Sequence, residues 1–250
     1  MSEHAAPATP RYALYYAPRP EEGLATTAGQ WLGRSPETGS VRARHAVPGL
    51  SPERLAEITA EPRFYGFHGT LKPPMALADD ASERDLVEAV GRFAAGQTAF
   101  AASSLNLVVL SGFFALAPQA RCAELQDLAD RCVVEFDEFR RPAEEHELAR
   151  RRAAGLTPRQ ETLLTRWGYP YVLDEWRFHL TLTGRISDDG ERAAVMAALQ
   201  RHFAAVVERP LPVNDLCIFR QPAMDRPFTV LARFRLGGGR RVRTETWSAP

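Results

Sequence analysis

The sequence predicts an α+β fold of two similar lobes, in which antiparallel-rich sheets face a central cleft and helices lie outside. Two observations carry this prediction. A His-x-Thr pattern occurs twice, at residues 67–71 and 178–182, within aromatic and aliphatic segments typical of strands. Each copy is followed by a turn and then by a segment of helical period, at residues 82–95 and 191–206. A repeated order of elements indicates an internal duplication.

The remaining elements follow the same order in both halves of the chain. The first half has an opening strand at 11–17 and a helix at 23–32 before the first motif, and strands at 105–110 and 113–116 after the helix at 82–95. The second half has a helix at 121–136, which follows the strand at 113–116, before the second motif, and strands at 213–219 and 228–234 after the helix at 191–206. Each half is therefore expected to run approximately β-α-β-α-β-β.

The domain organisation follows from this repeat. We expect a disordered leader at 1–10, a first lobe at 11–118, a second lobe at 119–236 and a tail at 237–250, with the lobes forming one structural unit. A helical insertion at about 140–168 interrupts the second lobe, with helices at 144–152 and 158–167. Its arginines allow two interpretations, a solvated basic helix or a lid over the cleft: Arg140, Arg141, Arg150, Arg151 and Arg152.

Composition restricts the class of partner. The 250 residues carry 31 Lys+Arg and 31 Asp+Glu, so no broad surface for long nucleic acid is expected. No apolar run reaches the length of a membrane span. The three cysteines lack the spacing of a zinc site or a disulfide framework, which favours the cytoplasm. A small phosphorylated substrate fits this composition better than a macromolecule.

The two motifs supply the functional prediction. Residues two apart on a strand point to the same face, so His68 and Thr70 form one set and His179 and Thr181 the other. Brought together, two imidazoles can act as general base and general acid on a phosphodiester, and two hydroxyls can bind its non-bridging oxygens. This chemistry needs no metal and no cofactor. Which histidine is the acid stays open, because the motifs are nearly symmetric.

Strand alternation adds three phosphate-binding candidates. Lys72 is expected on the face of His68, and Thr183 takes the corresponding place in the second copy. Arg177 shares the face of His179, and a charge within the run Trp-Arg-Phe-His needs a partner. For Lys72 the alternative is a solvated strand end. Tyr12 and Tyr16 share a face of the opening strand, where a core position is favoured over the pocket.

At these residues the chain resembles the 2H phosphoesterase superfamily, which has two H-x-T/S motifs in a duplicated fold. Longer strings resemble its DUF1045-type branch, which is associated with phosphonate metabolism: WLGR at 31–34, YGFH at 65–68, LKPP at 71–74, WGYPY at 167–171 and RFHLTLTG at 177–184. The chain departs from this pattern at Ser35, where Asp is expected, and at Gly69, where Ala is usual. The resemblance implies a metal-independent phosphoesterase acting on sugar or nucleoside cyclic phosphates.

Two other functions compete with a cyclic phosphodiesterase. A binding protein could hold a phosphorylated metabolite in the same cleft without turnover, although intact histidines and threonines in both copies argue against it. An enzyme that processes or ligates RNA ends could use the same scaffold, although zero net charge disfavours long RNA.

Overall fold

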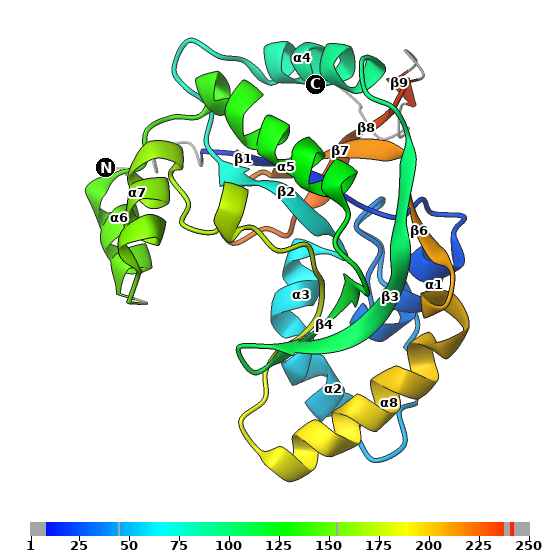
Figure 1. Ribbon diagram of the computed structural model, residues 1–250. Coiled ribbons are helices and arrows are strands. Elements are labelled where there is room, and N and C mark those ends of the chain that lie inside the picture. The colour runs from blue at the N-terminus through cyan, green and yellow to red at the C-terminus, as the bar shows by residue number, and fades with distance from the viewer. Residues whose placement is uncertain (1–8, 45, 154, 238–240, 243–250) are drawn as a thin grey trace, which may run out of the picture.

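The computed structural model describes residues 9–44, 46–153, 155–237 and 241–242, and it has one nine-stranded sheet in the order β6-β3-β4-β5-β2-β1-β7-β8-β9 (Figure 1). The strand pairs of the described residues are all antiparallel. The predicted α+β class with antiparallel pairing is confirmed. The strands are β1 (Arg11–Tyr16), β2 (Gly69–Met75), β3 (Phe100–Leu110), β4 (Phe113–Pro118), β5 (Leu180–Arg185), β6 (Pro210–Val213), β7 (Asp215–Gln221), β8 (Thr229–Arg235) and β9 (Arg241–Val242).

The helices surround this sheet and include an inserted pair. They are α1 (Gly23–Leu32), α2 (Pro52–Ile58), α3 (Ala60–Tyr65), α4 (Glu83–Ala95), α5 (Ala123–Glu135), α6 (Glu145–Arg152), α7 (Pro158–Trp167) and α8 (Asp189–Val207), with short 3-10 helices η1 (Asp137–Phe139) and η2 (Leu173–Glu175). None of the helices in the described part of the chain combines the length and the apolar character needed to span a bilayer.

The sheet consists of two halves that meet at the motif strands. One half is β6-β3-β4-β5 and the other is β2-β1-β7-β8-β9, and they are joined through a single residue pair, Gly69 with Leu180. Each half combines strands from both predicted lobes: β3 and β4 with β5 and β6 in one, and β1 and β2 with β7 and β8 in the other. The predicted lobe boundary at residue 118 stays a prediction, and it does not coincide with the boundary between the two halves of the sheet.

Helices cover one face of the sheet. Helix α5 packs against β2, α4 against β7 and β8, α8 against β3, and α1 against α8 and β5 (Figure 1). Side chains of these helices and of the strands form one large apolar core, which includes Leu71, Leu180 and Leu182. The predicted core residues Tyr12 and Tyr16 belong to it. A smaller cluster lies on the other face of β1 and β7, and it contains Tyr15, Phe219 and Phe228.

The ends of the helices follow from local hydrogen bonding. α4 begins with a capping box in which the Ser82 side chain accepts from the backbone N–H of Asp85. α7 begins with a capping box at Thr157 followed by proline, as its sequence predicts. α2 and α3 were not predicted, although Ser51 followed by Pro52 is a helix-start signal and the Ser51 side chain does cap α2.

The insertion is fixed to the sheet at its start. Leu77, just beyond β2, pairs with Arg140, and the backbone N–H of Arg141 donates to Ala76. Its helices α6 and α7 are confirmed, and no described residue of α6 is buried. The predicted leader and tail lie largely outside the described residues, apart from 9–10, 237 and 241–242.

Candidate active site

The two motif strands are neighbours in the sheet, as in-line chemistry at a shared site requires. Antiparallel pairing of Gly69 with Leu180 fixes their register. Continuing this register by one residue in each direction places each histidine opposite the threonine of the other motif. The resulting pairs are His68 with Thr181 and His179 with Thr70.

These four side chains lie on the face of the sheet opposite the large apolar core. Leu180 and Leu182 point into the helix-covered core, so alternation puts His179 and Thr181 on the other face. Thr70 pairs with Tyr15, which belongs to the small cluster on that same face. The structure therefore brings the two motifs together on one surface of the sheet.

His68 is held by a carbonyl and by an aromatic ring. Its Nδ1 lies 2.8 Å from the carbonyl oxygen of Gly66, so Nδ1–H donates and Nε2 carries the lone pair of the neutral ring. The hydroxyl of Thr70 lies 3.3 Å from this Nε2. The imidazole stacks on Tyr15, with ring centroids 3.7 Å apart and planes inclined by 16°. Tautomer and orientation are thus both set by neighbours.

His179 repeats this arrangement. Its Nδ1 lies 2.8 Å from the carbonyl oxygen of Arg177, again two residues earlier in the chain. Nε2 is therefore the atom left for chemistry on this histidine as well. An aromatic ring again lies nearby, because Phe113 of β4 is 5.7 Å from the imidazole, centroid to centroid. The duplication extends from the side chains to their backbone acceptors.

Burial disfavours the charged form of both imidazoles. Burial lowers the pKa of His68 to about 4, the Gly66 carbonyl opposes this shift, and the charge of His179 adds to it. Burial also lowers the pKa of His179, against the effect of the Arg177 carbonyl. The interaction between the two histidines means that a proton on one disfavours a proton on the other.

Aromatic side chains clamp the two motif strands together. Trp176 donates its indole N–H to the carbonyl oxygen of Thr70 over 2.8 Å. The Phe178 ring packs directly over the Cα of Gly69, where an added Cβ would lie 2.2 Å from a ring carbon. The absence of the usual alanine at position 69 is thereby explained, since only glycine leaves room for this ring.

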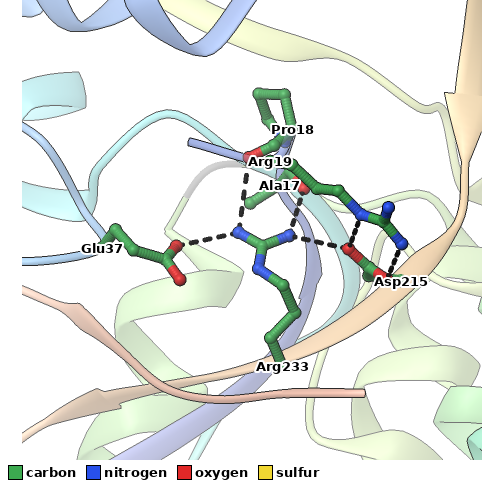
Figure 2. A network of polar contacts seen from close by, with 6 residues as sticks. All are labelled: Ala17, Pro18, Arg19, Glu37, Asp215 and Arg233. Carbon is green, nitrogen blue, oxygen red and sulfur yellow. Dashed lines mark hydrogen bonds and ion pairs between the residues drawn. The ribbon is translucent and has the colours of Figure 1, made fainter. Parts of the chain in front are cut away.

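The carbonyl that orients His68 is supported from behind. Gly66 has φ 82°, and a Cβ there would lie 2.7 Å from Pro36. Beside Pro36, Glu37 accepts from the Arg233 guanidinium at 2.8 Å. Figure 2 shows that this guanidinium also bonds the carbonyls of Ala17 and Pro18, just after β1, and the carboxylate of Asp215. This buried network joins the loop at Pro36 to the sheet.

Lys72 is not on the face predicted for it. Between Tyr15 and Leu14 of β1 the β2 register advances by two residues, from Thr70 to Lys72, which is the signature of a β-bulge. Lys72 therefore turns toward α5, is 2% exposed, and donates to the carbonyl of Val133 over 3.0 Å. Burial lowers its pKa to about 8. Neither the predicted phosphate contact nor the solvated strand end describes this placement.

Thr183 is also used inside the protein. The β4–β5 register shifts between the pairs Ala115–Thr181 and Phe113–Arg185. At this irregularity the Thr183 hydroxyl accepts from the backbone N–H of Phe114 over 3.0 Å, and the side chain is 1% exposed. Thr183 therefore satisfies a backbone donor that the shifted ladder leaves free, and it is not placed to bind a ligand.

Arg177 is the one of the three added candidates that remains available. Its side chain is exposed and forms no hydrogen bond or ion pair with any described residue. Two contributors were missed from sequence, Tyr15 and Trp176. Strand alternation places Tyr15 on the face opposite Tyr12 and Tyr16, and this could have predicted its contact with His68. No sequence pattern predicts the contact of Trp176 with Thr70. Within the described part of the chain, no group of three or more His, Cys, Asp or Glu residues could hold a metal ion.

Comparisons with known proteins identify relatives of this chain. A model of the family described as "Protein of unknown function (DUF1045)" matches residues 70–229. Ribose 1,5-bisphosphate phosphokinase PhnN of Janthinobacterium sp. (strain Marseille) is 38% identical over 231 residues, which are 91% of this chain and 51% of that protein. The PhnN of Laribacter hongkongensis (strain HLHK9) is 33% identical over 238 residues, 94% of this chain and 55% of its own.

Among solved structures, E. coli LigT complexed with 3′-AMP aligns over 91% of this chain and 98% of its own, with a TM-score of 0.38 and 14% identity. The chain spans about half the length of the curated relatives it matches. The family model covers well over half of the 250 residues and includes the second motif and Thr70 of the first. The chain belongs to the DUF1045 family.

Proposed function

We propose that the protein is a phosphoesterase that opens a cyclic phosphodiester by acid–base catalysis with His68 and His179. One observation carries the proposal: two imidazoles on one face of the sheet, each with Nδ1 fixed by the carbonyl two residues before it and Nε2 left for proton transfer. A binding site needs no such duplicated control of tautomer, whereas general acid–base catalysis depends on it.

The pKa shifts favour one division of roles. His68 is disfavoured as a cation by burial and by His179, so it acts as the neutral base that takes a proton from water. The attacking oxygen forms a bond to phosphorus while the bond to the leaving ester oxygen breaks. His179 delivers its Nε2 proton to that leaving oxygen. Burial lowers its pKa in the free protein, and the negative charge of a bound phosphodiester raises it.

The hydroxyls of Thr70 and Thr181 bind the non-bridging oxygens in this proposal. Both threonines are half-buried on the face of the histidines. Thr70 contacts Nε2 of His68 in the free protein, and the substrate phosphate displaces that contact. Arg177, whose side chain is free of partners among the described residues, adds a cationic contact at the exposed edge.

The names of the relatives suggest a ribose phosphate as the substrate, but we do not transfer their kinase reaction to this chain. Those proteins are named as kinases of a ribose bisphosphate, and this chain spans only about half of their length. A phosphate loop of the kind used by P-loop kinases needs a lysine after glycine, yet the single lysine of this chain is Lys72, within Leu-Lys-Pro-Pro. Lys72 is also buried against α5. We therefore favour a ribose cyclic phosphate as substrate over a kinase activity in this segment.

The test compares substrates with poor and good leaving groups. On a nucleoside 2′,3′-cyclic phosphate with EDTA present, His68→Asn and His179→Asn should each lower kcat by ~10²–10⁴-fold. On a p-nitrophenyl phosphodiester, whose leaving group needs no proton, His179→Asn should recover to within ~10-fold of the unaltered protein, and His68→Asn should not.

Circular dichroism checks that each variant is folded. If His68→Asn, and not His179→Asn, recovers activity on the p-nitrophenyl substrate, then His68 is the acid and His179 the base. Near-normal turnover of the cyclic substrate by either folded variant would remove the two-histidine mechanism.

A further inference from the structure

A second hollow opens at the far end of the strands that carry the histidine site. It has a volume of about 500 Å³ and lies between the start of β1, the end of β2, the turn after β7 and the insertion. Four arginines line it, one from the sheet and three from the insertion: Arg11, Arg140, Arg141 and Arg151. A volume of this size accommodates a small ligand or a large part of one.

The cavity lies on the same face of the sheet as His68. Alternation along β1 puts Arg11 on the side of Tyr15, and the guanidinium carbon of Arg11 lies 5.6 Å from the centre of the Phe228 ring. The ring centroid of Phe228 is in turn 6.3 Å from that of Tyr15, and the Tyr15 ring stacks on His68. Tyr15 lies four positions after Arg11, about 13 Å along a strand. One extended ligand can therefore reach both places.

Three of the arginines have no carboxylate partner within 4.0 Å among the described residues. Arg11 donates to the neutral amide oxygen of Gln221, at 2.8 and 2.5 Å. Arg151 lies over the Tyr169 ring, 4.6 Å from its centroid. The Arg141 side chain has no hydrogen-bond partner in the described part of the chain. Arg140, the fourth arginine, forms an ion pair with Asp137.

The carboxylates that line the cavity contact groups other than its four arginines. Glu144 and Glu147 form the capping box of α6, in which both carboxylates accept from backbone N–H groups, and Glu144 also contacts His146. Asp225 lies 3.8 Å from Arg226. Three of the four guanidinium groups therefore form no ion pair with a described carboxylate, although Glu144, Glu147 and Asp225 line the same cavity. Partial burial of these unpaired guanidinium groups favours the binding of an anion.

We propose that this cavity binds a second phosphate group of the substrate, distant from the phosphodiester that the histidines open. The proposal rests on the proposed function for its first half, and it gives the insertion a role in specificity. Guanidinium groups suit this ligand because their planar N–H pairs match phosphate oxygens. A sugar cyclic phosphate with a further phosphomonoester fits this arrangement better than one without it.

The experiment uses two substrates that differ by one phosphate: adenosine 2′,3′-cyclic phosphate with and without a 5′-phosphate. The unaltered protein should have a kcat/KM at least ~10-fold higher for the 5′-phosphorylated substrate, because one charge-assisted contact is worth about that factor. Arg141→Gln and Arg151→Gln should each reduce this ratio several-fold. Arg201→Gln, an exposed arginine of α8, is the matched control and should leave the ratio unchanged.

Calorimetry separates this inference from the hydrolase proposal. Adenosine 2′,5′-bisphosphate and adenosine 2′-monophosphate are titrated into the unaltered protein and into the same arginine variants. Tighter binding of the bisphosphate that is lost in Arg141→Gln supports the second site even if no cyclic phosphate is hydrolysed. Equal binding of the two nucleotides, or a preference that persists in both arginine variants, overturns it.

Discussion

Gly69→Ala tests whether the spacing of the motif strands depends on the Phe178 ring. An alanine Cβ would lie 2.2, 2.6 and 3.1 Å from three carbons of that ring, well inside van der Waals contact. The ring cannot move away freely, because Phe178 is 7% exposed and packs against Tyr16 and Trp176. Overpacking of this kind costs ~1–3 kcal/mol of unfolding free energy. In a chain of 250 residues, that corresponds to a fall of roughly 2–10 °C in Tm.

Phe178→Leu provides the compensating change. The two shortest contacts are to Cε2 and Cζ, which leucine lacks, while the 3.1 Å contact is to Cδ2. In the Phe178→Leu background, Gly69→Ala should therefore cost little, and the double-mutant cycle should give a coupling energy of ~1–3 kcal/mol. Urea unfolding followed by circular dichroism measures the four free energies.

The control is another glycine of a motif strand. At Gly184 an added Cβ meets only the carbonyl oxygen of Ile58 at 3.6 Å, so Gly184→Ala should be neutral or slightly stabilising. Additive effects of Gly69→Ala and Phe178→Leu would refute the steric account. So would an unfolding free energy of Gly69→Ala equal to that of Gly184→Ala.

Two further predictions concern pH and the shifted ladder. Burial lowers the pKa of both His68 and His179 in the free protein. The value of kcat/KM on a cyclic phosphate should therefore peak on the acid side of pH 6.5 and fall as pH rises further, because the catalytic acid then loses its proton. A plateau of kcat/KM extending above about pH 8 would contradict this. Thr183→Val should lower the unfolding free energy by ~1–3 kcal/mol, because the buried N–H of Phe114 loses its acceptor, and urea titration against Thr181→Val, whose site is half-buried, measures the difference.

The sequence was sufficient for the fold class and for the four motif side chains because both depend on short-range periodicity. Alternation within His-x-Thr is preserved in each motif strand, so His68 and Thr70 share a face as predicted. Their meeting with His179 and Thr181 required only that the duplicated strands be neighbours. The positions of Trp176 and Arg233 were beyond such reasoning, since Trp176 bonds Thr70, 106 positions away, and Arg233 bonds Ala17, 216 positions away.

Alternation fails where the ladder is irregular, and this explains the errors at Lys72 and Thr183. Both lie four residues after a motif histidine, just beyond the threonine, where the neighbouring strand shifts register. One extra residue, as in β2 before Lys72, reverses the face of the residues that follow it, whereas Thr183 lies inside an irregularity with two extra residues in β5. Nothing in a single sequence marks either irregularity. Both polar side chains then satisfy buried backbone groups, the Val133 carbonyl and the Phe114 N–H. The irregularities therefore leave the two His-x-Thr units as the polar groups that the motif strands present at the site. Positive charge for a larger substrate must come from residues outside these strands, such as Arg177.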